Sequence, residues 1–121
     1  MSYALIIDDN RNTADAMKQM LDLLDVENKI AYGSSAAIAI LGRDTPSMIT
    51  LDINMPGVDG FEVLAYLKRE PRLMFVPVVV ITSDDQPETR KRVMDLGASE
   101  MLIKPATLDA LEIVLQKIGI S

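Results

Sequence analysis

Short apolar runs alternate along the chain with segments in which apolar residues recur every three or four positions. Most of the runs are apolar almost throughout, which is typical of strands that are buried on both faces. They predict five strands, at residues 3–7, 28–32, 48–51, 76–82 and 100–103. The run VPVVVIT at 76–82 is β-branched at nearly every position, and such residues favour extended backbone.

The segments with helical spacing predict five helices, each following one of these strands. They lie at residues 11–24, 36–41, 60–69 and 87–96 and between Thr107 and Gly119. Residues suited to helix ends lie at these boundaries. Asp59 and Thr107 are suited to accept hydrogen bonds at a helix start, and Pro87 suits a first turn. Gly97 and Gly119 follow the last turns of two helices.

The order of these elements predicts the fold class. Five strand–helix units with apolar strands indicate an α/β protein whose parallel sheet is covered on both faces. Right-handed crossovers between the strands produce a doubly wound sandwich. Residues 1–121 contain no linker, low-complexity segment or repeat, and their number suits a single domain. In such folds the ligand site lies outside the carboxyl ends of the strands.

Polar residues stand where four of the predicted strands end. Asp8 and Asp9 follow the first strand, and Asp52 follows the third. Thr82 ends the fourth strand, and Lys104 follows the fifth. A parallel sheet would gather these side chains at one edge. Neighbouring carboxylates repel one another unless a cation joins them, and a hard oxygen site suits Mg²⁺. One carboxylate would then be free to attack phosphorus and form an acyl phosphate.

Each of these residues also has a structural explanation when it is taken alone. Asp8 and Asp9 could cap the helix that follows them, and Asp52 could begin a turn. A threonine at a strand end and a lysine before a proline are common without any function. The four signals together, in order at the ends of the first, third, fourth and fifth strands, favour a phosphoryl-transfer site.

Composition narrows the classes of function. The net charge is −6, and the basic run at 90–92 would fan around a helix, so we expect no nucleic-acid binding by this domain. The absence of His and Cys excludes disulfides and leaves carboxylates, hydroxyls and Lys for any chemistry. With no signal peptide and no apolar run long enough for a membrane span, we expect a soluble, cytoplasmic protein without membrane contact.

Five stretches carry a family resemblance: LIIDDN at 5–10, ITLDINMPGVDGFEVL at 49–64, PVVVITS at 77–83, LGASE at 96–100 and LIKPAT at 102–107. With them the chain closely resembles the receiver (CheY-like) domain of two-component response regulators, over nearly its whole length. The resemblance implies a single (βα)5 flavodoxin-like sandwich, doubly wound, whose five-stranded parallel sheet has the order 2-1-3-4-5. It also implies one receiver domain over 1–121, with no effector domain in these residues.

The resemblance implies a role for each acidic residue of the site. Asp52 is expected to be the phosphoacceptor and a ligand of Mg²⁺ or Mn²⁺. Asp9 is expected to bind the metal directly, and Asp8 is expected to hold a metal-bound water. The backbone carbonyl of Asn54 is expected to complete the metal site.

Further roles follow from the same resemblance. Thr82 is expected to be the switch hydroxyl that moves toward the phosphoryl group. Lys104, joined to Pro105 by a cis peptide bond, is expected to pair with Asp52 and then with phosphate. One position departs from the family, because Met101 stands where Tyr or Phe is usual. The usual coupling between threonine and an aromatic ring is therefore in doubt, and output would rest on backbone shifts after Thr82.

Three residues match positions that tune dephosphorylation in the family. Ser83 is small and leaves the phosphoryl pocket open. Asn54 and Asp84 stand where the family controls the access of hydrolytic water. We expect a self-dephosphorylation that is not exceptionally slow.

These matches predict a phosphoacceptor signalling domain rather than an enzyme acting on other substrates. A sensor histidine kinase or a histidine phosphotransfer protein would supply the phosphoryl group, and the domain would shift to an active conformation. A homodimer is left open. One alternative is a phosphorylation-independent, pseudo-receiver interaction module, which Met101 favours. Another is a Mg²⁺-dependent phosphatase of the haloacid-dehalogenase kind, but such enzymes begin with Asp-x-Asp, whereas Asp8 and Asp9 are adjacent.

Overall fold

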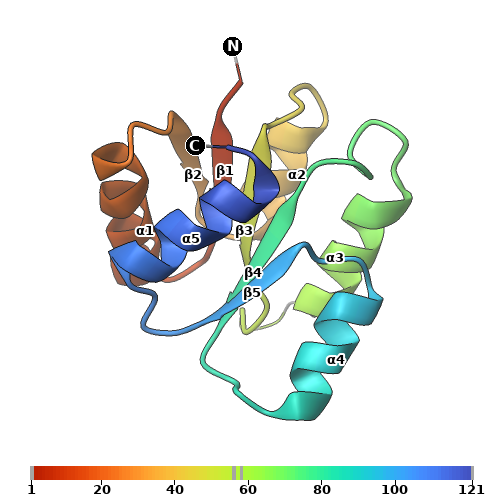
Figure 1. The fold of residues 1–121 in the computed structure, drawn as a ribbon. Coiled ribbons are helices and arrows are strands. Elements are labelled where there is room, and N and C mark those ends of the chain that lie inside the picture. Colours follow the sequence, from red (N-terminus) through yellow and green to blue (C-terminus); the bar gives the residue numbers. More distant parts are fainter. Residues whose placement is uncertain (1, 56, 58, 121) are drawn as a thin grey trace.

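Five parallel strands form the centre of the molecule, and helices cover both faces of the sheet (Figure 1). The computed structural model describes residues 2–55, 57 and 59–120. Within these residues the elements are β1 (Ala4–Ile7), α1 (Arg11–Leu23), β2 (Asn28–Ala31), α2 (Ser34–Leu41), β3 (Met48–Asp52), α3 (Gly60–Arg69), β4 (Val78–Thr82), α4 (Pro87–Asp95), β5 (Glu100–Ile103) and α5 (Leu108–Ile118). The strand order is β2-β1-β3-β4-β5, and every neighbouring pair is parallel. The predicted fold class and strand order are confirmed.

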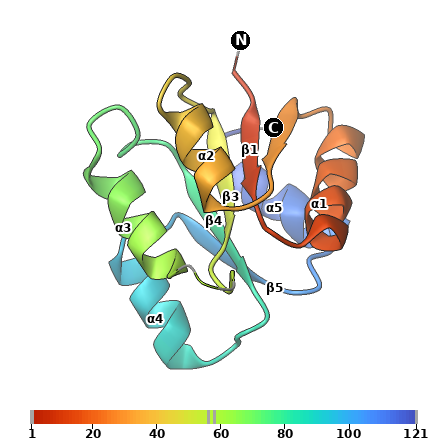
Figure 2. The same cartoon turned by 180° about the vertical axis from the view of Figure 1, so that it is seen from behind.

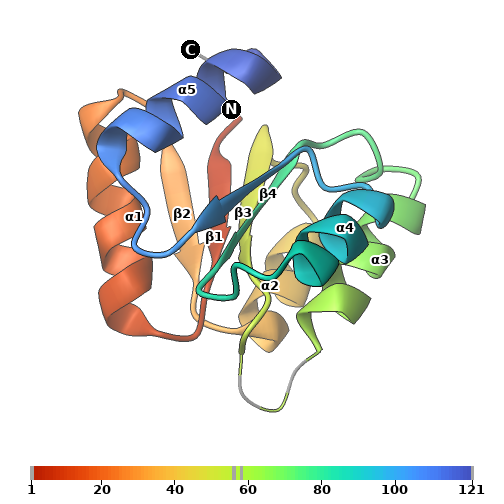
Figure 3. The same ribbon diagram turned by 60° about the horizontal axis from the view of Figure 1, so that its bottom comes forward.

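Each face of the sheet has its own apolar core. Helices α1 and α5 cover one face (Figure 3), and α2, α3 and α4 cover the other, which is turned toward the viewer in Figure 2. Side chains alternate along β1, so that Ala4 and Ile6 face α1 and α5, whereas Leu5 and Ile7 face the other three helices. Every residue of β1, β3 and β4 is buried. Burial on both faces explains why these strands are apolar throughout.

The elements begin and end close to the predicted residues. Asp59 and Thr107 accept hydrogen bonds from backbone N–H groups of α3 and α5, as N-caps do. The second helix begins two residues earlier than predicted, at Ser34. The strand predicted from residue 76 begins at Val78 instead. The chain is still in a turn at residue 76, whose N–H donates to a carbonyl three residues earlier.

The start of α3 lies directly against the loop that follows β3. A Cβ atom on Gly60 would lie 2.3 Å from the Cα atom of Ile53 and 2.7 Å from its carbonyl oxygen. These distances leave no room for a side chain, so glycine is what allows the helix to approach the loop. The contact fixes the course of the chain immediately after Asp52.

Candidate functional site

The carboxyl ends of four strands bring the predicted site residues to one edge of the sheet, at the bottom of Figure 1. Asp52 is the last residue of β3, and Thr82 is the last residue of β4. Asp8 and Lys104 are the first residues after β1 and β5. The register of the parallel pairs keeps these strand ends nearly level. Residues more than 90 positions apart in sequence thus become neighbours.

Three carboxylates form a cluster at this edge. Asp8, Asp9 and Asp52 each offer one oxygen, and these oxygens all lie within 4.8 Å of one another. Asp8 and Asp52 are buried, whereas Asp9 is exposed. The cluster therefore has two acids anchored in the protein and one at the solvent side.

The loop after β1 holds Asp8 firmly. Its Oδ1 accepts a hydrogen bond from the Asn10 backbone N–H at 2.9 Å, and its Oδ2 accepts one from the Thr13 hydroxyl at 2.6 Å. The side chain of Asn10, and not that of either aspartate, caps α1 by accepting from the Thr13 N–H at 3.1 Å. Since Asn10 is the cap, the alternative in which Asp8 or Asp9 only caps the helix is wrong.

A single ammonium group lies between the two buried acids. Lys104 Nζ is 3.4 Å from Asp52 Oδ2 and 3.7 Å from Asp8 Oδ2. The backbone N–H of Lys104 donates to the Thr82 carbonyl at 2.8 Å, which fixes the lysine at the end of β5. The predicted cis peptide bond between Lys104 and Pro105 is present.

The surroundings of Asp52 act on its charge in opposite directions. Burial raises the pKa of Asp52, and the neighbouring Asp8 raises it further. The Asn54 N–H, which donates to Asp52 Oδ1 at 3.0 Å, and the Lys104 ammonium lower that pKa. The net shift is upward. Without a further cation, this carboxyl group ionises less readily than an exposed aspartate.

The donor set fits a hard divalent cation such as Mg²⁺ or Mn²⁺. Three clustered carboxylates face one ammonium, so negative charge is in excess, and carboxylate oxygens are the ligands such ions prefer. Across the described ranges 2–55, 57 and 59–120, no other three His, Cys, Asp or Glu side chains meet in this way. A pocket beside the cluster opens to solvent, and it is lined by Asp9, Asn10, Asp52, Asn54, Ser83 and Lys104.

The Thr82 side chain is fully buried and is not among the residues that line this pocket. Its hydroxyl oxygen accepts a hydrogen bond from the Asn54 side-chain amide at 2.7 Å and another from the Asp84 backbone N–H at 3.1 Å. Asn54 and Asp84, which provide these two donors, are the residues that the family resemblance predicts to control the access of hydrolytic water. The structure brings Asn54 and Thr82 together although 28 positions separate them.

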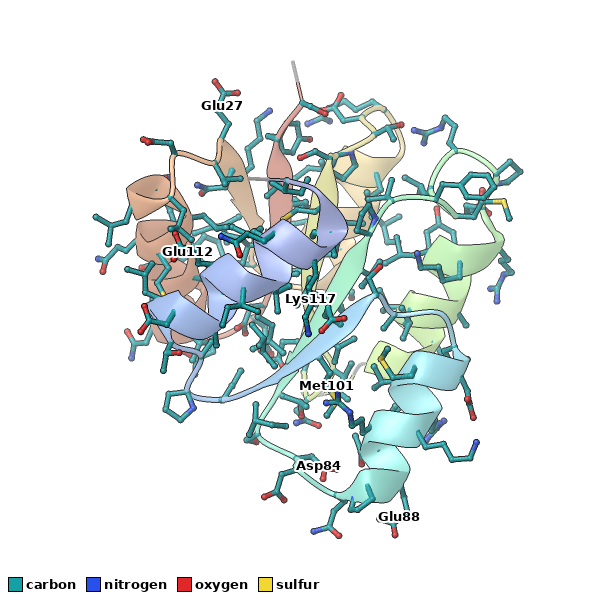
Figure 4. All side chains as sticks on the ribbon, viewed as in Figure 1. Glu27, Asp84, Glu88, Met101, Glu112 and Lys117 are labelled. Carbon is teal, nitrogen blue, oxygen red and sulfur yellow. The ribbon has the colours of Figure 1, made fainter. Side chains whose placement is uncertain are left out.

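The Asp84 carboxylate is engaged at the start of α4 (Figure 4). Its Oδ1 accepts from the Gln86 N–H at 2.9 Å, and its Oδ2 accepts from the Thr89 hydroxyl at 2.6 Å. These bonds, the one to Thr89 above all, lower the pKa of Asp84. Ser83, in contrast, lines the pocket beside the carboxylate cluster.

Met101 lies on β5 beside Val80, with 6% of its surface exposed (Figure 4). Its side chain belongs to the apolar core beneath α2, α3 and α4. A thioether is at most a weak hydrogen-bond acceptor, so Met101 fills space at this position and offers no hydroxyl.

Sequence reasoning missed two polar contacts of the site. The first is Thr13, whose hydroxyl donates to the Asp8 carboxylate; the local signal that could have pointed to it is its place in the first turn of α1, three residues after the N-cap Asn10. The second is the bond from the Asn54 amide to Thr82. No local sequence pattern predicts this hydrogen bond, because the two residues are 28 positions apart.

Comparisons with known proteins place the chain among relatives of known family and fold. Residues 4–116 match the response regulator receiver domain family. Response regulator PleD of Caulobacter vibrioides is 37% identical over 101 residues, which cover 84% of this chain and 22% of PleD. The probable methanogenesis regulatory protein FilR2 of Methanothrix harundinacea is 31% identical, over 94% of this chain and 79% of FilR2. The signal receiver domain of a DNA binding response regulator from Colwellia psychrerythraea, 28% identical, superimposes over all of both chains with a TM-score of 0.91.

None of the helices in the described residues combines the length and the apolar character that crossing a bilayer requires.

Proposed function

Since the chain belongs to the response regulator receiver domain family, we propose that it is a single phosphoacceptor domain over residues 1–121 and that Asp52 is the residue modified. The phosphoryl group comes from a phosphohistidine on a sensor histidine kinase or a histidine phosphotransfer protein. The observation that carries the proposal is the cluster of Asp8, Asp9 and Asp52 beside the Lys104 ammonium.

The reaction is a displacement at phosphorus. A carboxylate oxygen of Asp52 forms a bond to phosphorus, and the bond from phosphorus to the imidazole nitrogen breaks. The nitrogen keeps the electron pair of that bond and takes up a proton, so the products are an acyl phosphate on Asp52 and a neutral imidazole. In dephosphorylation, water attacks phosphorus, the Asp52 carboxylate leaves, and inorganic phosphate is released.

The residues around Asp52 have complementary tasks. The Asn54 N–H holds Oδ1 of Asp52, while Lys104 lies near Oδ2 and is close enough to follow a phosphoryl group bound there. Thr82 turns its hydroxyl toward that group once it is present. Asn54 and Ser83 set the access of hydrolytic water from the pocket lining.

The carboxylates of Asp8, Asp9 and Asp52 would hold Mg²⁺ or Mn²⁺, with the Asn54 carbonyl completing the set. Such an ion, when bound, neutralises charge that develops on the transferring phosphoryl group. Asp8 is held by Asn10 and Thr13 and suits the role of a fixed outer acid, which binds the ion through water. Asp9 is exposed and suits a direct ligand.

The test is a measurement of intact mass. The protein is incubated with acetyl phosphate and Mg²⁺, and we expect a gain of one phosphoryl group that is absent in Asp52→Asn. Asp25→Asn, a matched change at an exposed aspartate far from the site, should keep the gain. No gain in the unmodified protein, or the same gain in Asp52→Asn, contradicts the proposal.

A phosphorylation-independent interaction module is the second candidate, and the presence of Met101 at the position of the usual aromatic ring favours it. The two candidates differ in metal binding, because a module of this kind has no use for the acidic cluster. Mg²⁺ affinity measured by calorimetry separates them. Binding that disappears in Asp9→Asn supports the phosphoacceptor, and an absence of binding supports the interaction module.

A further inference from the structure

The hydroxyl of Thr82 is fully occupied as a hydrogen-bond acceptor. A hydroxyl oxygen has two lone pairs and one proton. One lone pair accepts from the Asn54 amide at 2.7 Å, and the other accepts from the Asp84 N–H at 3.1 Å. Any rotation that carries this oxygen toward Asp52 breaks both bonds. The two donors therefore restrain the rotation of the Thr82 side chain.

Asp84 connects this restraint to helix α4. Its backbone N–H binds the Thr82 hydroxyl, and its carboxylate binds the Gln86 N–H and the Thr89 hydroxyl at the start of the helix. One residue thus holds the switch threonine on one side and the first turn of α4 on the other. A change in the Asp84 backbone reaches the helix through these two bonds.

Asn54 connects the same restraint to the phosphoacceptor. Its backbone N–H donates to Asp52 Oδ1 at 3.0 Å, and its side-chain amide donates to the Thr82 hydroxyl. The resulting path runs without a gap from the Asp52 carboxylate through Asn54, Thr82 and Asp84 into α4. It is polar throughout, and every distance in it lies between 2.6 and 3.1 Å.

We propose that Asn54 is a positioning residue, whose side-chain amide holds the Thr82 hydroxyl and thereby keeps Asp84, which binds Gln86 and Thr89 at the start of α4, in its resting place. Breaking the Asn54 bond frees Thr82 to turn and loosens the start of α4. The trigger, a phosphoryl group on Asp52, rests on the proposed function, whereas the restraint exists without it.

Among the described residues, the apolar core around β5 offers no other polar route by which a change at Asp52 could reach helix α4. Met101 is buried in the apolar cluster and has no hydroxyl, so it makes no polar link between the site and the surface. The Asp84 bonds supply a link that does not depend on residue 101. The polar path is therefore available where this chain lacks the aromatic ring that the family resemblance implies.

Amide hydrogen exchange of the unphosphorylated protein, measured by NMR, tests the proposal. In Asn54→Ala we expect the Asp84 and Gln86 amides to exchange about fivefold faster, because a hydrogen bond of this kind contributes about 1 kcal/mol. Asn28→Ala is the matched control: its amide donates to Asp22 at 2.7 Å, far from Thr82, and its loss should leave both rates unchanged.

A second variant separates the path from a general loss of stability. Thr82→Val keeps the shape of the side chain and removes the acceptor, so Asn54→Ala should add nothing to the exchange rates in that background. Unchanged rates in Asn54→Ala, or a full additional increase in the Thr82→Val background, overturns the proposal. Since no phosphoryl donor is present, either result leaves the mass test of Asp52 unaffected.

Discussion

At the scale of the residue, the three carboxylates of the site differ in their exposure to solvent. Asp52 ends a strand that is buried along its whole length, and its pKa is raised chiefly because burial disfavours the charge. Lys104, 3.4 Å away, opposes this shift without cancelling it. Asp9 lies on the solvent side of the cluster and is exposed. The protein thus keeps Asp52 and Asp9 in different environments, one buried and one exposed.

The raised pKa of Asp52 predicts a dependence of stability on pH. The folded state holds this proton more tightly than the unfolded chain, in which the pKa of Asp is about 3.9. Stability from this group is therefore complete below about pH 3.9 and is lost as the pH rises through the higher pKa of the folded state. At pH 7 the ionised Asp52 lowers the free energy of unfolding.

Asp52→Asn should accordingly be more stable than the parent at pH 7 without divalent cations, and the difference should shrink toward zero near pH 3. Urea unfolding at both pH values in the presence of a chelator measures this. Asp25→Asn serves as the exposed control, for which we expect no difference at either pH. Equal stabilities of Asp52→Asn and the parent at pH 7 would show that burial is not the dominant influence on the pKa of Asp52.

At the scale of the element, glycine positions along the helices differ in what they tolerate. Gly60 begins α3 against the backbone of Ile53, whereas Gly42 ends α2 in ordinary right-handed helical backbone at φ −69°. A Cβ atom at Gly42 would meet the carbonyl oxygens of Ile38 at 3.4 Å and Ala39 at 3.5 Å, which are ordinary contacts. The same substitution should therefore have opposite effects at the two helices.

Gly60→Ala should lower the free energy of unfolding by about 2 to 3 kcal/mol, because overpacking a fixed backbone contact outweighs the helix propensity of Ala. Gly42→Ala should raise it by about 0.5 kcal/mol, since Ala restricts the unfolded chain and fits the native backbone. Thermal or urea unfolding of the two variants tests the pair. A Gly60→Ala protein as stable as the parent would mean that the loop after β3 yields easily.

At this scale, the sequence predicts the strands and helices but not every contact between loops. Apolar runs and capping residues located every strand and helix, because burial on both faces and helix capping leave local patterns. The parallel order then brought Asp8, Asp52 and Lys104 together as expected. The bond between Asn54 and Thr82 could not be foreseen, since it depends on side-chain rotation between loops. The late start of β4 depends on a turn that apolar residues alone do not reveal.

At the scale of the whole molecule, the carboxylate cluster lies at one edge of the sheet, and an apolar core lies on each face of the sheet. The acidic edge is built from loops that the two cores hold in place, α1 and α5 on one side and α2, α3 and α4 on the other. A cation bound there would join Asp8 and Asp9, which follow β1, to Asp52, which ends β3. Ligand binding should therefore stabilise the fold as a unit.

Mg²⁺ at a hundredfold excess over its dissociation constant should stabilise the protein by about 2.7 kcal/mol, because it binds the folded state alone. The melting temperature measured with and without Mg²⁺ tests this. The shift should disappear in Asp9→Asn and persist in Asp25→Asn. A shift of the same size in Asp9→Asn would indicate that the ion binds elsewhere.

The edge position of β2 has a practical consequence for anyone who wishes to modify this protein. β2 pairs with β1 alone. The turn after it contributes none of the clustered acids and neither Lys104 nor Thr82. Gly33 in this turn has φ +112°, a conformation that favours glycine, so Gly33 itself should be kept. Among the turns at the carboxyl ends of the strands, the turn after β2 is thus the one whose length is least constrained by the carboxylate site. It is the natural attachment point for a label that reports on Asp52 without entering its pocket.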